Sequence, residues 1–377
     1  MKIVTVIGAR PQIIKASAIS RSLSEYFQGK TQEIIVHTGQ HYDRNMSEVF
    51  FEELHIPRPK YNLNIGSGMH GVQTAGMISG LEQILLDECP DAVILYGDTN
   101  STLAGAVAAG KINIPIVHVE AGLRSFDKTM PEEINRILCD HVSTLLFCPT
   151  KAGYDNLKHE GFNTDISLHP TFNNPNVYLC GDIMYDNTLY FERIALTKQE
   201  TKNRFPKDFI LCTVHRNTNT DDKDKLTDIV KALCEVSLYR TIVIPMHPRT
   251  KKMVYSLLSE KTLDAFVNNK NIIITEPVSF LDMIYLESQA SLVITDSGGV
   301  QKEAYFLKKP CIILRPQTEW TEIVETGSAF IAATNTDVII KKVKEYLDCP
   351  PDNFPSLFGD GHAADFITKT IHSTLNG

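Results

Sequence analysis

Short apolar runs rich in valine and isoleucine alternate with longer amphipathic segments along the chain. In the first half these runs occupy residues 2–8, 33–38, 91–98, 115–122, 143–150 and 177–182. Their hydrophobicity is nearly continuous rather than alternating, which is typical of strands buried on both faces of a sheet. Amphipathic segments such as 70–88 and 131–142 separate the runs and predict helices. This alternation of strand and helix predicts a parallel, doubly wound α/β sheet.

The same pattern stops and then restarts, which predicts a second domain. HPTFNNPN at 169–176 predicts a loop, and the charged, proline-containing segment 197–208 predicts a linker. Further apolar runs follow at 208–215, 241–247, 271–277, 291–299 and 310–315. We therefore expect two similar-sized Rossmann-like domains. Their predicted limits are 1–170 for the first domain, 171–200 for its last strand and the linker, 201–358 for the second domain and 359–377 for a terminal helix.

Composition and charge exclude several classes of protein. The chain has 377 residues, of which 43% are hydrophobic and 22% charged, as in an ordinary globular protein and unlike a disordered one. No stretch approaches the ~18 uninterrupted apolar residues of a membrane helix, and the first apolar run ends at Gly8, too early for a signal peptide. The net charge of −8 argues against nucleic acid as a partner. Eight scattered cysteines without a CxxC favour a reducing cytoplasm.

Familiar cofactor and metal motifs are missing. GAVAAGK at 105–111 has the spacing of a phosphate-binding loop, but an isoleucine follows the lysine and the alanine-rich string predicts a helix. No GxGxxG follows the first strand, which argues against NAD bound in the usual manner. His37 and His41 are four residues apart, but Gly39 lies between them in a predicted loop, and HExxH is absent. We expect neither a cofactor nor a metal ion.

Carboxylates gather where predicted strands end or helices begin. Asp98 and Glu120 each end a strand, and Glu132 and Glu133 open a helix after Pro131. Asp98 could simply cap a helix, and the two helix acids could simply complement the helix dipole. Glu120 is harder to explain in that way, because an acid at the end of a buried strand needs a partner or a task. Together these acids suit proton transfer and stabilisation of developing positive charge.

A second cluster suits an anion. DSGGVQKE at 296–303 places Ser297, Gly298 and Gly299 between a strand and a helix, where unobstructed backbone N–H groups bind phosphate. Glu303, further along that helix, could accept hydrogen bonds from ribose hydroxyls or could simply be solvated.

Cations also follow buried strands at the same kind of position. Arg10 follows the first strand, and His215 and Arg216 follow a later one. They suit a diphosphate, although Arg10 could instead form a structural ion pair. Ligands of open α/β sheets bind outside the carboxyl ends of the strands, so we expect a cleft between two facing domains.

Nine segments, in order over nearly the whole chain, resemble the non-hydrolysing UDP-N-acetylglucosamine 2-epimerases. These segments are GARPQIIK, TGQHYD, GDTNSTLAGA, HVEAGLRS, PEEINR, CPT, TVHRN, HPRT and DSGGVQKEA. The resemblance implies a glycosyltransferase-B-type fold, with the nucleotide mainly on the second domain and a C-terminal helix that crosses back to the first. It also implies a UDP-sugar substrate, a homodimer and a place in polysaccharide biosynthesis.

The resemblance further implies roles for individual residues. Asp98, Glu120 and Glu132 are similar in position to the family's catalytic acids, and His215 to the group near the diphosphate. Substrate-binding roles are implied for Arg10, Lys15, Arg136, Ser297, Gly298, Gly299 and Glu303. Regulatory or sugar contacts are implied for Gln40, His41, His247, Gln317 and Glu319.

The expected chemistry follows from the sugar. Its C2 proton is not adjacent to a carbonyl group, and without NAD a transient oxidation is not available. The remaining route is anti elimination of UDP to a 2-acetamidoglucal, followed by re-addition after protonation on the other face. Carboxylates would stabilise the oxocarbenium-like C1, while cations and helix N–H groups would stabilise the departing diphosphate.

The chain departs from the best-known family members at 317–322, at 66–77 and in the loop after TGQHYD. QTEWTE at 317–322 has Trp320 where those members carry arginine, and GSGMHGVQTAGM at 66–77 has no arginine. Known members bind a second UDP-GlcNAc as an activator near these loops, and Asp43 together with the missing arginine argues against such activation here. GARPQ, an NTDD-like segment and QTEW are closer to a subgroup that acts on UDP-2,3-diacetamido-2,3-dideoxyglucuronate, which stays open as an alternative substrate. A glycosyltransferase of the same fold is a further alternative, but it has no need of three acids in the first domain.

Overall fold

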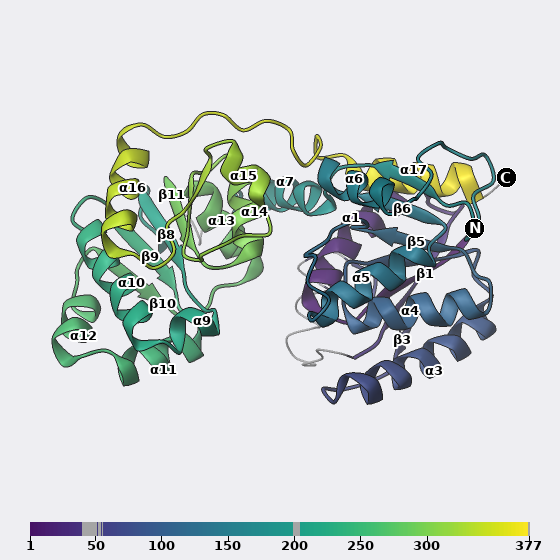
Figure 1. Ribbon diagram of the computed structural model, residues 1–377, viewed down its shortest axis with the longest axis horizontal. Coiled ribbons are helices and arrows are strands. Elements are labelled where there is room, and N and C mark those ends of the chain that lie inside the picture. The colour runs from purple at the N-terminus through teal and green to yellow at the C-terminus, as the bar shows by residue number, and fades with distance from the viewer. Residues whose placement is uncertain (40–50, 52–53, 55, 199–203, 376–377) are drawn as a thin grey trace. The chain divides into compact units, whose positions relative to one another are not determined.

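The computed structural model describes residues 1–39, 51, 54, 56–198 and 204–375 (Figure 1). The chain divides into two compact units. Unit 1 consists of Met1–Asn187 with Ser356–Gly377, and unit 2 of Thr188–Pro355. The first division falls inside helix α7 (Ile183–Ala195). No helix in the described ranges is long and apolar enough to cross a bilayer.

Unit 1 is built on a parallel sheet of seven strands in the order β3-β2-β1-β4-β5-β6-β7. The strands are β1 (Lys2–Ile7), β2 (Gln32–His37), β3 (Tyr61–Asn62), β4 (Ala92–Tyr96), β5 (Ile116–Val119), β6 (Leu145–Cys148) and β7 (Asn176–Leu179). Val4 of β1 lies opposite Ile34 on one side and Val93 on the other. The chain order reverses between β1 and β4, so the topological switch point, where ligands bind in such sheets, lies at the ends of these two strands.

Helices cover the sheet of unit 1. They are α1 (Arg10–Phe27), α3 (His70–Glu88), α4 (Asn100–Lys111), α5 (Pro131–His141), α6 (Lys151–His159) and α17 (Ala363–Leu375). Met77 of α3 and Ala104 of α4 share one apolar core with strand residues. The string GAVAAGK lies inside α4, so the prediction of a helix there is confirmed.

The C-terminal helix α17 packs against α1, although the two are separated by most of the sequence. The Ser22 hydroxyl lies 2.7 Å from that of Thr368 and donates to Asp365 Oδ1 at 2.8 Å. The rings of Phe27 and His372 stack with their centroids 4.2 Å apart. The chain therefore returns from unit 2 to complete unit 1.

Unit 2 repeats the design with a parallel sheet in the order β10-β9-β8-β11-β12-β13. Its strands are β8 (Phe209–Thr213), β9 (Thr241–Pro245), β10 (Ile272–Thr275), β11 (Leu292–Thr295), β12 (Cys311–Ile313) and β13 (Ala329–Ile331). Besides part of α7, its helices are α9 (Asn217–Thr220), α10 (Lys223–Val236), α11 (Pro248–Leu257), α12 (Glu260–Val267), α13 (Phe280–Gln289), α14 (Gly298–Phe306), α15 (Thr321–Glu325) and α16 (Thr336–Asp348). The order reverses between β8 and β11, which places the switch point before His215 and Asp296.

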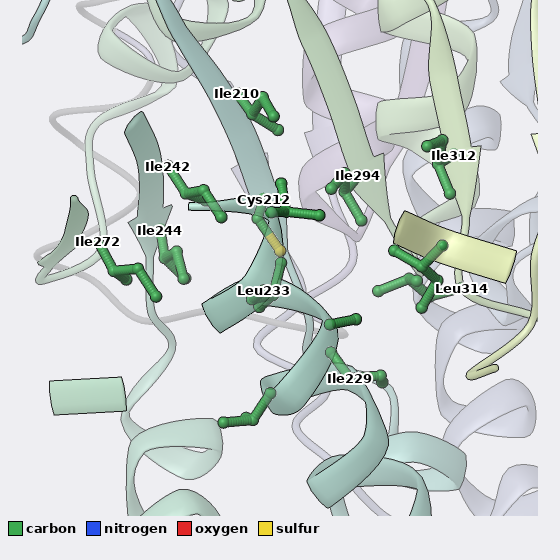
Figure 2. Packing of buried hydrophobic residues seen from close by; sticks show 14 of the residues in the cluster. Ile210, Cys212, Ile229, Leu233, Ile242, Ile244, Ile272, Ile294, Ile312 and Leu314 are labelled. Carbon is green, nitrogen blue, oxygen red and sulfur yellow. The ribbon is translucent and has the colours of Figure 1, made fainter. Parts of the chain in front are cut away.

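Isoleucines on neighbouring strands dominate the core of unit 2. Figure 2 shows Ile210, Ile242 and Ile294 on three strands and Leu233 on α10, which belong to one core cluster. Each of these side chains is at most 3% exposed. Burying a side chain of this size stabilises the fold by about 1.5–3 kcal/mol relative to leaving it in water. The continuous apolar runs predicted such strands, because residues on both faces of the sheet are buried.

Candidate active site

Gln12, a residue for which the sequence predicts no role, connects the carboxyl ends of β1 and β4 by hydrogen bonds. Gln12 is 2% exposed, and its Oε1 accepts hydrogen bonds from the backbone N–H groups of Gly8 (2.9 Å) and Ala9 (3.1 Å). Its Nε2 donates to the carbonyl of Tyr96 at 2.9 Å. Its position in the first turn of α1, where a glutamine can bond back to the preceding backbone, is the signal that could have revealed it.

Gly8 sits where no larger residue fits. A Cβ at this position would lie 2.0 Å from the Ser101 hydroxyl and 2.3 Å from that of Thr38. The absence of a side chain at Gly8 therefore lets the turn after β1 approach the start of α4 closely.

Lys15 and Glu120 form an ion pair at this edge of the sheet. Lys15 Nζ lies 2.5 Å from Glu120 Oε2, and the two side chains are 11% and 14% exposed. Glu120 has a backbone φ of 75°, in the left-handed region that residues other than glycine rarely adopt. Such strain is found most often where function requires a particular geometry. The structure thus brings together two residues that were predicted separately.

Asp98 and Arg136 form a second ion pair. Arg136 Nη2 lies 2.6 Å from Asp98 Oδ2, and the Asp98 side chain is 28% exposed. Burial raises the pKa of Asp98, Arg136 opposes that rise, and the charge of Glu120 adds to it. Asp98, Glu120, Lys15 and Arg136 therefore act on one another electrostatically, which joins the two pairs into one charged cluster.

The two neighbouring acids of α5 have different environments. Glu132 is exposed on the first turn. Glu133 is buried, and its oxygens accept from the backbone N–H groups of Ser125 (2.9 Å) and Phe126 (3.0 Å) and from Arg136 Nη1 (2.8 Å). Burial opposes its charge, but these donors lower the pKa of Glu133. Glu133 thus holds a loop and orients Arg136, while Glu132 remains the candidate for contact with substrate.

In unit 2, Asp296 organises the loop that carries His215. Asp296 is fully buried, and its carboxylate accepts from the backbone N–H groups of His215 (3.1 Å) and Arg216 (3.0 Å) and from Asn219 Nδ2 (3.1 Å). The His215 side chain is 48% exposed, with Nδ1 3.7 Å from Asp296 Oδ1. His215 is therefore held by its backbone while its ring stays accessible to solvent.

The start of α14 is the place where the sequence predicts an anion site. The Ser297 hydroxyl caps the helix by accepting from the Val300 N–H at 3.5 Å. The N–H groups of Gly298 and Gly299, in the first turn, have no acceptor within the helix. A Cβ at Gly299 would meet only the Ser297 hydroxyl, at 3.8 Å, so this surface is open to a ligand.

Trp320 and Glu319 pack against this helix start. Trp320 Nε1 donates to the Gly298 carbonyl at 3.0 Å, and Lys302 Nζ lies 4.3 Å from the centroid of the Trp320 ring. Arg315 holds the Glu319 carboxylate with two hydrogen bonds of 2.7 Å. Burial opposes the charge of Glu319, but Arg315 lowers the pKa of that group. The segment QTEW, which differs from the best-known family members, therefore contacts the helix terminus that is expected to bind the nucleotide.

Glu303 of α14 has a buried acidic neighbour that was not foreseen. Glu287 of α13 is fully buried, and burial followed by the proximity of Glu303 raises the pKa of Glu287 well above its usual range. Burial and the neighbouring Glu303 thus both favour the neutral form of the Glu287 carboxyl group.

The remaining predicted contacts are less informative. Arg10 is exposed at the start of α1, and His247 and Gln317 are exposed in unit 2. The His247 ring caps α11 by accepting from the Arg249 N–H at 3.2 Å. Gln40 and His41 lie outside the described residues. The described ranges contain no group of three or more His, Cys, Asp or Glu that could hold a metal ion.

Two doubly wound parallel sheets, with the predicted binding residues at both switch points, define a protein of the glycosyltransferase-B type. The fold alone also matches a glycosyltransferase from Rickettsia africae, with a TM-score of 0.55 and 13% identity. The profile of the UDP-N-acetylglucosamine 2-epimerase family matches residues 26–372. This chain belongs to that family.

Individual relatives match over almost their whole length. A UDP-N-acetylglucosamine 2-epimerase homolog from Methanococcus maripaludis is 46% identical, over 99% of this chain and 100% of that protein. The UDP-2,3-diacetamido-2,3-dideoxy-D-glucuronate 2-epimerase of Pseudomonas aeruginosa is 45% identical, over 98% of this chain and 99% of that protein. The crystal structure of the Methanocaldococcus jannaschii UDP-GlcNAc 2-epimerase with UDP-GlcNAc and UDP has a TM-score of 0.81 at 43% identity, and covers 98% of this chain and 99% of that one.

Proposed function

We propose that this chain interconverts UDP-GlcNAc and UDP-ManNAc by epimerisation at C2, without net hydrolysis. The observation that carries the proposal is the charged cluster of unit 1, in which the pairs Lys15–Glu120 and Asp98–Arg136 stand at the carboxyl edge of the sheet. A simple sugar-nucleotide binder has no use for two ionised acids, one of them on a strained backbone.

The reaction begins with elimination. A carboxylate takes the C2 proton, the electrons of the C–H bond form the C1–C2 double bond, and UDP departs with the electrons of the C1–O bond. The product is 2-acetamidoglucal with UDP retained. Asp98, Glu120 and Glu132 supply carboxylates for proton transfer and for the positive charge that develops at C1. Re-addition of UDP with protonation of C2 on the opposite face gives the epimer, which requires proton-handling groups on both faces.

The UDP moiety is assigned to unit 2. The first-turn N–H groups of α14 and the ring of His215 suit the diphosphate, and Glu303 suits the ribose hydroxyls. Holding UDP while the glucal exists favours re-addition over loss to water. Arg10 is proposed as a further diphosphate contact from unit 1.

A homodimer and a cytoplasmic setting complete the proposal. Met130, the N-cap of α5, and Ile134 and Leu138 within the helix are 38%, 45% and 46% exposed, and Ile134 and Leu138, four residues apart, share one face of α5. An apolar stripe of this kind on an exposed helix supports a contact with a second copy of the chain. A place for the product in polysaccharide biosynthesis is part of the same proposal.

UDP-2,3-diacetamido-2,3-dideoxyglucuronate is the second candidate substrate. It is supported by the 45% identity to the Pseudomonas aeruginosa enzyme, which is close to the 46% identity to the UDP-N-acetylglucosamine 2-epimerase homolog of Methanococcus maripaludis. The elimination chemistry is the same for both sugars, so the difference concerns recognition at C3 and C5.

One experiment tests both substrates. The protein is incubated with each UDP-sugar in D2O and followed by NMR. Deuterium at C2 with intact UDP-ManNAc supports the proposal, whereas deuterium in the uronate alone moves the assignment to the second substrate. Free UDP with free ManNAc indicates a hydrolysing enzyme. Turnover that depends on an added acceptor indicates a glycosyltransferase and overturns the proposal.

A further inference from the structure

A histidine outside the charged cluster lies fully buried between two acceptors. His118, in β5, places Nε2 2.8 Å from the Gly97 carbonyl and Nδ1 2.7 Å from Asp140 Oδ1. Neither the His118 nor the Asp140 side chain has measurable exposure. A carbonyl oxygen can only accept, so Nε2 carries a proton.

The hydrogen bonds of Asp140 show whether His118 Nδ1 is protonated. Asp140 Oδ2 accepts from the Gly122 N–H at 3.2 Å and from Arg124 Nη1 at 2.7 Å. These donors suit an ionised carboxylate, which in turn can only accept from His118 Nδ1. Both ring nitrogens therefore carry protons, and His118 is an imidazolium.

The charges of the surrounding groups agree with this assignment. Burial opposes the charge of His118, but Cys139 and Asp140 raise its pKa well above the usual range. Arg124 is in turn held by Glu160 through two hydrogen bonds of 2.7 Å. Two cations thus face two carboxylates, so the charges of the four groups balance.

These contacts fix the backbone on both sides of the proposed catalytic acids. Gly97, whose carbonyl His118 holds, directly precedes Asp98, and its N–H donates to the Val119 carbonyl at 3.0 Å. In sequence, Glu120 lies two residues after His118 and two residues before Gly122. The Gly122 N–H donates to Asp140. The φ angle of Glu120 is 75°, a conformation that is unfavourable for a residue other than glycine, so this turn needs support from contacts outside itself.

We propose that His118 and Asp140 are positioning residues, which hold Asp98 on one strand and Glu120 on the next in the geometry that proton transfer at C2 requires. The inference rests on the proposed epimerase function. Neither residue is expected to touch the sugar. The pair acts through the backbone, and a displacement of about 1 Å at a catalytic group can lower a rate by about 100-fold.

The charge state is tested first, on the full-length protein without substrate. With 15N-labelled histidine, the His118 signals are identified by their loss in His118→Gln. The wild-type ring should show two N–H correlations at pH 8. A single N–H correlation at that pH overturns the inference, whether or not the protein turns over a sugar.

Kinetics then separate positioning from general stability. We expect His118→Gln and Asp140→Asn to lower kcat by about 100-fold, with KM and the Kd of UDP changed by less than about threefold. Thr368→Val is the matched control, since it removes a buried hydrogen bond between α1 and α17 and should keep the wild-type kcat. If His118→Gln does not fold, Asp140→Asn carries the test.

Two outcomes contradict the inference at this stage. A folded His118→Gln or Asp140→Asn protein with the wild-type kcat overturns it, and so does a loss of UDP binding in parallel with kcat. A wild-type protein that shows two N–H correlations but exchanges deuterium into no UDP-sugar overturns the proposed function instead, so the two failures are distinguishable.

Discussion

Lys15 Nζ lies 2.5 Å from Glu120 Oε2, beneath a turn in which Glu120 adopts a left-handed backbone conformation. The ammonium group stabilises the ionised carboxylate, which is the form that can accept a proton from C2. This arrangement places the proposed base at the end of a buried strand, close to the pair formed by Asp98 and Arg136.

Glu120→Gln should abolish deuterium incorporation at C2. The amide preserves the size of the side chain but cannot accept the proton, and removal of a general base costs about 10²–10⁴-fold in rate. The Kd of UDP, measured by calorimetry, should be unchanged because the nucleotide is assigned to unit 2. Exchange at the wild-type rate in this variant would refute the catalytic role.

Glu132 and Glu133 provide a matched pair of adjacent substitutions. Glu132→Gln should lower turnover and leave the melting temperature unchanged, because Glu132 is exposed. Glu133→Gln should lower both, because one buried oxygen atom becomes an NH2 group that faces backbone donors and Arg136. The expected loss of stability is about 1–3 kcal/mol, read from chemical denaturation. An unstable Glu132→Gln protein beside a stable Glu133→Gln protein would reverse the two assignments.

Much of this arrangement is predictable from local sequence, and the reasons for the exceptions are physical. The long strands appear as continuous apolar runs because both faces of the sheet are covered. Strands β3 and β13 have two and three residues and are too short to leave a periodicity. Asp98 and Glu120 could be predicted because parallel strands end at one edge.

The supporting contacts could not be predicted in this way. Gln12 binds a carbonyl 84 residues away, and His118 binds a carboxylate 22 residues away. Such pairs depend on how the strands are ordered in the sheet, which no local pattern records. The difference between Glu132 and Glu133 likewise depends on which one faces the loop at 125–126.

Trp320 should contribute to nucleotide affinity through the start of α14. Trp320→Phe removes the hydrogen bond to the Gly298 carbonyl and keeps an aromatic ring beside Lys302. A neutral hydrogen bond is worth about 0.5–1.5 kcal/mol, so we expect the Kd of UDP to rise about 2–10-fold. Lys302→Met is the companion variant, since it removes the cation and leaves the hydrogen bond. Unchanged affinity in Trp320→Phe would show that QTEW does not shape the nucleotide site.

The apolar stripe on α5 should govern assembly. Ile134→Asp places a charge at the centre of the stripe and should convert the proposed dimer to a monomer in sedimentation velocity experiments. Val267→Asp is the control, because Val267 is an exposed apolar residue of unit 2 with 38% exposure. A dimer that persists in Ile134→Asp, or a wild-type monomer, would contradict the proposed interface.

His37 should make unit 1 sensitive to acid. Burial lowers the pKa of His37 to about 4, and its Nδ1 accepts from the Gly39 N–H at 2.9 Å. In the unfolded chain the pKa returns to about 6.5, so the unfolded state binds an extra proton between pH 6.5 and pH 4. The stability contributed by neutral His37 is therefore full above pH 6.5 and is lost as the pH falls towards 4, with a total on the order of 3 kcal/mol.

His37→Asn tests this linkage, since the amide oxygen can accept from Gly39 but the side chain does not titrate. We expect the variant to be less stable than the wild type at pH 8, because it packs less well. The gap should close between pH 6.5 and pH 4, as measured by urea denaturation at each pH. A constant gap across that range would show that His37 is already charged in the folded protein. His37 and His118, which are both fully buried in the same sheet, would then carry the same charge instead of the neutral and charged states expected here.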